Sequence, residues 1–403
     1  MASNDAAAPD PVIAPVIALV AGEASGDLLG GALVERLRER WPRARFVGVA
    51  GRRMQAAGVE AWWDSRELAV MGLFEVVRHF PRLLQLRRAL RSRLEQLRPD
   101  VFIGIDAPDF NLGLEVQLRQ AGLRTVHYVS PTVWAWRQGR VRKIRRAADL
   151  VLCLFPFEPA FYDGHGIEAA YVGHPLADQI PPSADPARDQ RAARLALGLA
   201  PEATTVALLP GSRLSEVGLL AGPMLQAARL LTARRPGTQF VAALANEAVA
   251  ACFTEAMRTE GVTGVTPVAE RPREVIAAAD VVLCASGTAT LETMLINRPL
   301  VMTYRLARST YLAAKHLRLI RRQLFALPNI LAGEALVPEL IQDEASAERL
   351  AAATERWLDD PVAVAALRAR FAELHERLRC DAAGRAAEAV AGLIAADRTR
   401  KDP

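Results

Sequence analysis

The sequence is poor in cysteine. Its four cysteines, Cys153, Cys252, Cys284 and Cys380, lie far apart, and none belongs to a Cys-x-x-Cys pair. Structural zinc sites and disulfide frameworks both need sets of cysteines at characteristic spacings. The sequence therefore argues against either class and favours a reducing compartment such as the cytoplasm.

Long hydrophobic runs are missing as well. No apolar stretch approaches the roughly 18 residues that a helix needs to cross a bilayer. Residues 12–22 are apolar, but no lysine or arginine precedes them, so we do not expect a signal peptide. Residues 1–14 are predicted to be a disordered extension. We expect a protein that does not span a membrane but is free to lie on one.

Two signatures of cofactor and metal binding are absent. No Gly-x-Gly-x-x-Gly follows the first predicted strand, and no acidic residue ends a second strand at the spacing of dinucleotide-binding folds. No Asp-x-Asp pair appears either. We therefore expect neither a cofactor nor a metal ion.

Acidic residues are scarce in three segments where cations gather. Residues 137–146 and 305–322 each carry six lysines and arginines and no acid, and residues 82–98 carry six arginines against one glutamate. Each cluster alone is typical of a solvated helix face. Together, on a chain of net charge +5, they indicate an anionic partner: nucleic acid, lipid head groups or a phosphorylated substrate.

What the sequence does contain is a repeated alternation of short apolar runs and amphipathic helical stretches. The predicted strands are residues 15–20, 45–49, 101–105, 124–129, 150–154 and 170–172, then 205–209, 239–244, 281–284 and 299–303. This alternation predicts parallel sheets covered by helices.

A proline-rich segment, residues 181–186, separates the two series of strands. We therefore predict an α/β fold with two doubly wound, Rossmann-like domains over residues 15–180 and 187–370, followed by C-terminal helices and a tail over 371–403. In such sheets ligands bind at the carboxyl ends of the strands, so we expect the active site in a cleft between the domains.

The most informative stretch is residues 280–292, where an apolar strand ends at Ser286-Gly287-Thr288 and a helix follows. Free backbone N–H groups and the positive end of a helix dipole suit a phosphate there. Glu292 lies one helical turn beyond Thr288, where a carboxylate can reach a ribose. The alternative is an ordinary strand-to-helix turn, since short glycine turns are common.

A second turn of this kind follows the first strand of the same predicted domain, at Gly211-Ser212-Arg213. Gly211 permits close backbone approach, Ser212 donates a hydrogen bond, and Arg213 offers a bidentate guanidinium to a diphosphate. Two such turns on one sheet indicate a phosphate site more specifically than either turn alone. Asn329 is a further candidate ligand contact, with an ordinary loop asparagine as the alternative.

Carboxylates follow the strands of the first predicted domain. Glu23 and Asp27 lie near the start of a helix, where they suit sugar hydroxyls better than phosphate; helix capping is the alternative role. Asp106 directly follows the strand 101–105 and is a candidate general base, with a turn residue as the alternative and Asp109 as a rival base.

An apolar stripe lies along residues 68–84. Its membrane-facing candidates are Leu73, Phe74, Val77, Phe80 and Leu84. Arginines flank it, so the stripe is compatible with a helix on an anionic membrane surface, and core packing is the alternative.

Eight motifs occur in order along residues 15–385. They are Gly22-Glu23-Ala24-Ser25-Gly26-Asp27, Gly104-Ile105-Asp106-Ala107-Pro108-Asp109-Phe110-Asn111, His127-Tyr128-Val129-Ser130-Pro131, Val133-Trp134-Ala135-Trp136-Arg137, Gly173-His174-Pro175, Leu209-Pro210-Gly211-Ser212-Arg213, Ala285-Ser286-Gly287-Thr288-Ala289-Thr290-Leu291-Glu292 and Leu327-Pro328-Asn329. With these motifs the chain closely resembles the lipid-A-disaccharide synthases, inverting glycosyltransferases of lipopolysaccharide biosynthesis.

The resemblance implies a GT-B fold and transfer of 2,3-diacylglucosamine from its UDP derivative to 2,3-diacylglucosamine 1-phosphate. The products would be the β-1,6-linked disaccharide 1-phosphate and UDP. It also implies a cytoplasmic protein bound peripherally to the inner membrane, no nucleic-acid partner, and a homodimer that exchanges C-terminal parts.

On this reading Asp106 is the base, and Glu23 and Asp27 position hydroxyl groups. Ser212, Arg213 and the N–H groups of residues 286–288 would hold the leaving diphosphate. Glu292 would contact the ribose and Asn329 the nucleotide or donor sugar.

Two other functions stay open at this point. A UDP-sugar 2-epimerase has the same two-domain plan but needs no acceptor. A non-catalytic RNA-binding protein could use the clusters 134–146 and 305–322, and it would bind RNA with a steep dependence on salt.

Overall fold

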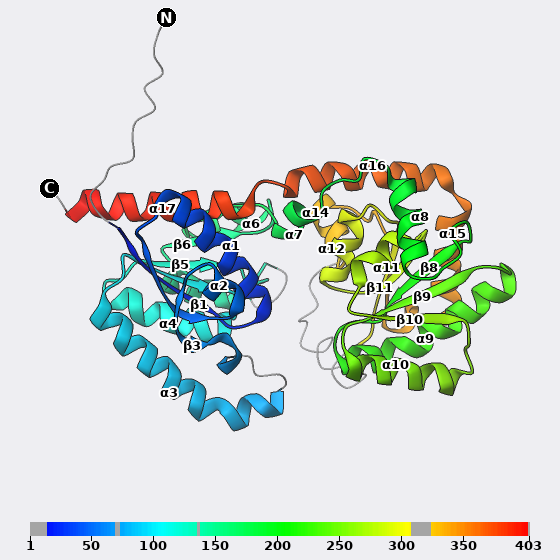
Figure 1. Ribbon diagram of the computed structural model, residues 1–403, viewed down its shortest axis with the longest axis horizontal. Coiled ribbons are helices and arrows are strands. Elements are labelled where there is room, and N and C mark those ends of the chain that lie inside the picture. The colour runs from blue at the N-terminus through cyan, green and yellow to red at the C-terminus, as the bar shows by residue number, and fades with distance from the viewer. Residues whose placement is uncertain (1–13, 69–72, 135–137, 308–323, 402–403) are drawn as a thin grey trace, which may run out of the picture. The chain divides into compact units, whose positions relative to one another are not determined.

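The computed structural model describes residues 14–68, 73–134, 138–307 and 324–401, and the side chains of these residues except 73–80, 138 and 397–401. The chain forms two compact units (Figure 1). The first ends at Pro175 and resumes at Asp381, and the second covers Leu176–Cys380. Each unit is built on one parallel sheet with helices on both faces.

The first unit contains a seven-stranded sheet of order β3-β2-β1-β4-β5-β6-β7. Its strands are β1 (Val16–Ala21), β2 (Arg45–Ala50), β3 (Glu60–Asp64), β4 (Val101–Ile105), β5 (Thr125–Tyr128), β6 (Leu150–Cys153) and β7 (Ala169–Tyr171). Its helices are α1 (Ala24–Arg40), α2 (Arg52–Ala56), η1 (Ser65–Glu67), α3 (Leu73–Leu97), α4 (Pro108–Gln120), η2 (Gln138–Arg140), α5 (Val141–Ala147), α6 (Glu158–Asp163) and α17 (Ala382–Lys401).

The second unit contains a six-stranded sheet of order β10-β9-β8-β11-β12-β13. Its strands are β8 (Thr205–Leu209), β9 (Gln239–Leu244), β10 (Val265–Ala269), β11 (Val281–Ala285), β12 (Leu300–Tyr304) and β13 (Glu339–Ile341). Its helices are α8 (Pro186–Ala196), α9 (Leu214–Arg234), α10 (Glu247–Glu260), α11 (Pro272–Ala278), α12 (Thr288–Leu295), α14 (Leu327–Ala332), η3 (Gln342–Glu344), α15 (Ala347–Asp359) and α16 (Pro361–Leu378). The short helix α7 (Pro175–Gln179) begins at the boundary of the two units.

The interior strands are apolar on both faces, because helices cover both. In β1, Ile17 and Leu19 belong to a core shared with α1 and α17, whereas Ala18 and Val20 belong to a core shared with α3 and α4. Successive side chains of a strand point to opposite faces, so an interior strand needs apolar residues at every position. This is why the strand sequences read as continuous apolar runs.

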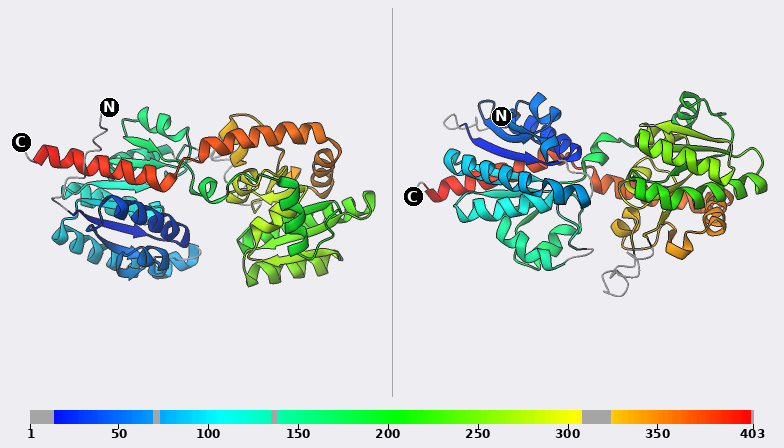
Figure 2. Two further views of the ribbon diagram at one scale, coloured as in Figure 1. Left: turned by 45° about the horizontal axis from the view of Figure 1, so that its top comes forward. Right: turned by 90° about the horizontal axis from the view of Figure 1, so that it is seen from below.

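The last helix, α17, returns to the first unit. Its buried residues Ala386, Ala387, Val390 and Ile394 lie in the same core as β1 and α1. Figure 1 and the left view of Figure 2 both show this helix, in red, lying along the first unit. The C-terminal helix α17 therefore completes a core of the first unit.

The boundaries differ from those expected from the sequence. The division falls at Pro175/Leu176 rather than at the proline-rich residues 181–186, and α16 belongs to the second unit while α17 belongs to the first. The expected C-terminal segment 371–403 is therefore divided between the two units. The sequence offers no local signal for this, because the partner of α17 lies more than 300 residues away in the chain.

The predicted fold class is confirmed: both sheets are parallel and doubly wound. Three strands were not predicted, β3, β10 and β13, and each is an edge strand. Among the described residues, no helix combines the length and the apolar character needed to cross a membrane.

The packing of α17 gives a first prediction. Ile394→Ala should destabilise the first unit by about 2–4 kcal/mol, because it leaves a cavity in a buried core. Urea unfolding followed by tryptophan fluorescence measures this as a lower midpoint. Glu388→Ala, an exposed position on the same helix, is the matched control and should leave the midpoint unchanged. Equal effects of the two substitutions would contradict the described packing.

Candidate active site

Two polar turns meet at the carboxyl edge of the second sheet. β8 leads into residues 211–213, and its sheet neighbour β11 leads into residues 286–288. Because neighbouring parallel strands end side by side, both turns line one cavity of about 330 Å³. The predicted nucleotide-binding residues in its wall are Gly211, Ser212, Arg213, Ser286, Gly287, Thr288 and Glu292.

Both turns end in helix N-termini, which favour anions. Gly211 has a φ of 114° and Gly287 a φ of 122°, in the region that favours glycine. The helices α9 and α12 start directly after these turns, and the first N–H groups of a helix have no partner inside it. The helix dipoles add positive potential at the same place. The cavity is therefore suited to a phosphate group.

A carboxylate already occupies one of these turns. Glu216 Oε2 accepts the backbone N–H groups of Ser212 at 3.2 Å and Arg213 at 3.3 Å, and Oε1 lies 3.1 Å from the Arg213 guanidinium. A Cβ atom on Gly211 would lie 2.6 Å from Glu216 Oε2, so a side chain there would collide with it. The turn thus binds an anionic group of the protein itself. The sequence prediction missed Glu216, although a glutamate at this place after a helix start is the signal for a capping box.

Glu292 stands in the wall of the same cavity. Its Oε1 accepts a hydrogen bond from Arg273 Nε on α11 at 3.1 Å, and 17% of its side chain is exposed. The guanidinium fixes the orientation of the carboxylate. The remaining lone pairs can accept hydrogen bonds from hydroxyl groups of a ligand.

At the carboxyl edge of the first sheet, two carboxylates have no partner among the described residues. β1 leads to Glu23 and its neighbour β4 leads to Asp106. Glu23 is exposed and Asp106 is half-buried. Neither side chain makes a hydrogen bond or an ion pair with any residue that the structure describes. Both are therefore available to a hydroxyl group of a ligand.

The backbone at Asp106 and Ala107 adopts a left-handed conformation that is uncommon for residues other than glycine. Asp106 has a φ of 50° and Ala107 a φ of 43°, both left-handed. The Asp106 N–H donates to the Tyr128 carbonyl at 2.8 Å, and Asn111 Nδ2 donates to the Asp106 carbonyl at 2.9 Å. A Cβ atom on Gly22 would come within 2.7 Å of Ala107 Cβ. Strained backbone held by its surroundings in this way concentrates at functional sites.

The structure corrects the role expected for Asp27. This side chain is buried, and its oxygens accept the backbone N–H groups of Gly51 at 2.8 Å, Arg53 at 2.9 Å and Met54 at 3.1 Å. These bonds cap the N-terminus of α2. A buried carboxylate with three backbone partners is committed to the fold, so we assign Asp27 a structural role instead of a contact to sugar hydroxyls.

Asn329 needs the same correction. It is fully buried, its Nδ2 donates to the Val337 carbonyl at 2.9 Å and to Glu339 Oε1 at 2.8 Å, and its Oδ1 accepts the Val337 N–H at 2.9 Å. All hydrogen atoms of the amide are used inside the protein. Asn329 joins α14 to the start of β13, so we assign its side chain a structural role.

Asp109, the rival candidate for a base, lies on the first turn of α4. Its Oδ1 is 2.6 Å from Arg140 Nη2, and 83% of its side chain is exposed. The ion pair occupies this carboxylate, whereas Asp106 has no partner. The geometry therefore favours Asp106 as the group that meets a substrate hydroxyl.

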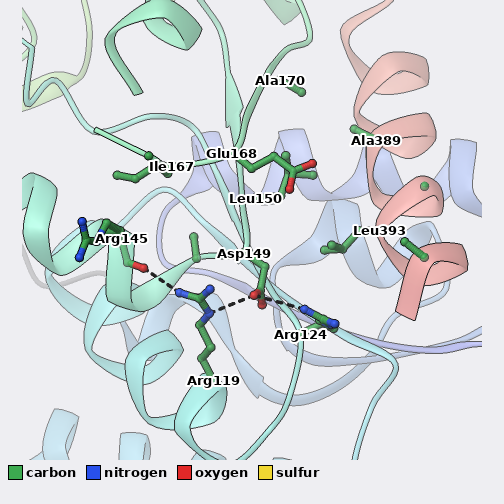
Figure 3. A pocket seen from close by; sticks show the side chains of 14 residues that line it. Arg119, Arg124, Arg145, Asp149, Leu150, Ile167, Glu168, Ala170, Ala389 and Leu393 are labelled. Carbon is green, nitrogen blue, oxygen red and sulfur yellow. Dashed lines mark hydrogen bonds and ion pairs between the residues drawn. The ribbon is translucent and has the colours of Figure 1, made fainter. Parts of the chain in front are cut away.

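A second cavity, of about 750 Å³, lies at the opposite edge of the first sheet (Figure 3). Asp149 stands at its centre and is bonded to Arg119 at 3.0 Å and Arg124 at 3.5 Å. Ala389 and Leu393 of α17 form part of its wall. Because this cavity lies before β5 and β6, at the amino ends of the strands, it is not the place where doubly wound sheets bind substrates.

A buried acid lies behind the carboxyl ends of β5 and β6. Glu158, 1% exposed, accepts the indole N–H of Trp134 at 2.8 Å and the backbone N–H of Phe155 at 2.9 Å. Burial raises the pKa of Glu158 to about 7, although these hydrogen bonds oppose the shift. The sequence prediction missed this residue, since nothing in its local pattern separates it from a surface glutamate at a helix start.

Comparisons with known proteins agree with this geometry. The lipid-A-disaccharide synthetase family matches residues 17–390. A lipid-A-disaccharide synthase of Xanthomonas oryzae pv. oryzae is 52% identical over 388 residues, covering 94% of this chain and 88% of the relative.

The chain belongs to the lipid-A-disaccharide synthetase family.

Solved structures with low sequence identity share the fold. The UDP-GlcNAc 2-epimerase of Neisseria meningitidis, bound to UDP-GlcNAc, is 11% identical with a TM-score of 0.60, covering 94% of this chain and 98% of its own. The calicheamicin glycosyltransferase CalG4 is 16% identical with a TM-score of 0.57, covering 95% and 98%. At such identities the likeness shows the fold alone.

Membership of the family confirms the prediction that this chain is a glycosyltransferase of lipid A disaccharide synthesis. The epimerase alternative rests only on similarity of fold. Within the described ranges, no group of three or more histidine, cysteine, aspartate or glutamate side chains is placed to hold a metal ion.

The membrane-facing candidates lie largely outside the described side chains. Leu73, Phe74, Val77 and Phe80 belong to the first part of α3, whose side chains the structure does not describe. Leu84 is half-buried.

The raised pKa of Glu158 gives a prediction about stability. The native carboxyl keeps its proton up to about pH 7, while an unfolded glutamate releases it near 4.5. The native state therefore loses stability relative to the unfolded state as the pH rises between these values, by roughly 3 kcal/mol in all. Glu158→Gln removes this titration. The melting temperature of the variant, compared with that of the unchanged protein, should rise between pH 5 and pH 7.5. A constant difference over this range would contradict the raised pKa.

Proposed function

We propose that this enzyme transfers 2,3-diacylglucosamine from its UDP derivative to the 6-hydroxyl of 2,3-diacylglucosamine 1-phosphate. The products are the β-1,6-linked disaccharide 1-phosphate and UDP. One observation carries the proposal: the two turns 211–213 and 286–288 line a single anion-favouring cavity in a chain of the lipid-A-disaccharide synthetase family.

The diphosphate of the donor lies against these two turns in this proposal. The backbone N–H groups at Ser286–Thr288, the Ser212 hydroxyl and the Arg213 guanidinium neutralise the charge that develops on the leaving UDP. Removing a single preorganised donor of this kind typically lowers kcat about 10²–10³-fold. Glu292, held by Arg273, accepts the ribose hydroxyls.

The first unit supplies the base. Asp106 takes the proton from the acceptor 6-hydroxyl as its oxygen bonds to the anomeric carbon of the donor. The bond from that carbon to the UDP oxygen breaks at the same time, and UDP leaves with the electron pair. Attack opposite to the leaving group inverts the anomeric configuration to β. Glu23, unpaired at the end of the neighbouring strand, positions a hydroxyl of the acceptor or donor.

Both substrates carry acyl chains, so the enzyme works at the cytoplasmic face of the inner membrane as a peripheral protein. The arginine-flanked apolar stripe at the start of α3, including Leu84, is the proposed contact surface. The enzyme forms a homodimer by exchanging C-terminal helices. This exchange is compatible with α17, which completes a core that is formed mostly by residues far away in the sequence.

The transfer itself can be tested with one assay. UDP release from UDP-2,3-diacylglucosamine should require 2,3-diacylglucosamine 1-phosphate and should continue in EDTA, since the leaving charge is met by the protein. Mass spectrometry of the lipid product identifies the disaccharide 1-phosphate. Release or epimerisation of the donor without an acceptor would contradict the proposal.

The base assignment gives a sharper prediction. Asparagine tolerates left-handed backbone and matches aspartate in shape, so Asp106→Asn should keep the fold while removing the base. We expect kcat to fall about 10²–10⁴-fold, the usual share of a general base. Asp109→Asn should keep kcat within a few-fold. If the two variants exchange these outcomes in the same assay, Asp109 is the base and Asp106 is a turn residue.

A further inference from the structure

Three cations converge on the helix that follows Asp106. Arg87 of α3, Arg140 of η2 and Lys143 of α5 approach α4 from three separate elements. A Cβ atom built on Gly113 would lie 2.6 Å from Arg87 Nη1 and 4.0 Å from Lys143 Nζ. Because Gly113 has no side chain, Arg87 and Lys143 can lie close to the helix. The roles assigned above use only Arg140, as the partner of Asp109.

The cluster carries more positive than negative charge. Asp109 pairs with Arg140, whereas Arg87 and Lys143 make no hydrogen bond or ion pair within the described residues. Loss of hydration lowers the pKa of Lys143, Asp109 opposes this, and Arg140 and Arg87 lower the pKa further. Arg87 and Lys143 thus have no counter-ion among the described residues.

One other acid, Glu115, lies near Lys143, but it already has a partner. The Oε1 of Glu115 is 2.8 Å from His127 Nδ1, and both side chains are fully buried. Glu115 cannot move out to join the surface cluster without leaving this partner. Among the described residues no further acid pairs with Arg87 or Lys143, so an anion from outside the protein can bind there.

The position of the cluster limits what that anion can be. Gly113 lies five residues beyond Pro108, the first residue of α4, or ~7.5 Å along the helix axis at 1.5 Å per residue. Asp106 lies just before the start of the same helix. The cations and the free carboxylate are thus separated by more than this rise, a span that a whole sugar 1-phosphate with a hydrogen bond at each end can bridge. In glucosamine 1-phosphate, the 6-hydroxyl and the phosphate lie at two ends of the pyranose ring.

We infer that Arg87, Arg140 and Lys143 bind the 1-phosphate of the acceptor and select it over a dephosphorylated sugar. This inference rests on the proposed function and names the specificity site of that reaction. The phosphate oxygens accept hydrogen bonds from the two guanidinium groups and the ammonium group. The bound phosphate directs the 6-hydroxyl at the opposite end of the sugar toward Asp106.

The test combines two acceptors with single substitutions. Initial rates are measured with 2,3-diacylglucosamine 1-phosphate and with 2,3-diacylglucosamine in neutral detergent micelles. For the phosphorylated acceptor, Lys143→Ala and Arg140→Ala should each lower kcat/KM roughly 10- to 100-fold, the usual effect of losing a hydrogen bond between charged groups. The KM of the UDP donor should not change, and neither should the rate with the dephosphorylated acceptor.

Two further variants separate charge from structure. Arg146→Ala removes an exposed cation from the same helix, α5, and should change neither acceptor. Lys143→Arg keeps the charge and should retain most of the preference for phosphate. Equal losses on both acceptors would show a structural role and overturn the inference, as would no loss at all. If the unchanged enzyme transfers to neither acceptor, it is the proposed function that fails.

A soluble probe distinguishes the substrate phosphate from lipid head groups. Glucosamine 1-phosphate should inhibit the unchanged enzyme competitively with the acceptor and more strongly than glucosamine does. Lys143→Ala should abolish this difference, and Arg146→Ala should preserve it. If instead Lys143→Ala lowers the rate only after anionic phospholipid is added to the micelles, the cluster binds the membrane surface and the inference is wrong.

Discussion

The pairing of neighbouring parallel strands is the constraint on which the sites of this enzyme depend. β8 lies beside β11, and β1 lies beside β4, so residues about 80 positions apart in the sequence meet at one edge of each sheet. The turn 211–213 gains its partner 286–288 in this way, and Glu23 comes to the edge that also carries Asp106. Each sheet edge concentrates one kind of chemistry: backbone donors in the second unit and unpaired carboxylates in the first.

The same constraint explains how much of the fold was predictable. Interior strands such as β1 and β8 are covered on both faces, so their apolar runs are continuous and easily recognised. The unpredicted strands all lie at sheet edges. β3 is half-exposed, β10 contains Pro267 and alternates buried with exposed residues, and β13 has three residues. An edge strand has fewer apolar neighbours, and its sequence therefore resembles a loop.

The site was predictable where its chemistry lies in the backbone and less so where it lies in side chains. The first N–H groups of a helix favour anions through the backbone itself, and the turns 211–213 and 286–288 share one cavity. Asp27 and Asn329 were assigned to ligands because polar residues near helix ends suit either a ligand or the backbone. Which of the two they serve depends on partners in other elements, Gly51 for Asp27 and Val337 for Asn329, and the residues next to them in the sequence do not reveal these contacts.

Glu216 has a consequence for the catalytic cycle. Its carboxylate accepts the N–H groups of Ser212 and Arg213 and pairs with the Arg213 guanidinium, so these donors are never left unsatisfied between turnovers. A nucleotide that binds this turn must displace the Glu216 carboxylate from these donors. This displacement offsets part of the nucleotide's binding free energy. In the proposed reaction, this internal competitor would lower the affinity of the turn for UDP. The donors that hold Glu216 are thus the same donors that the proposed leaving group would use.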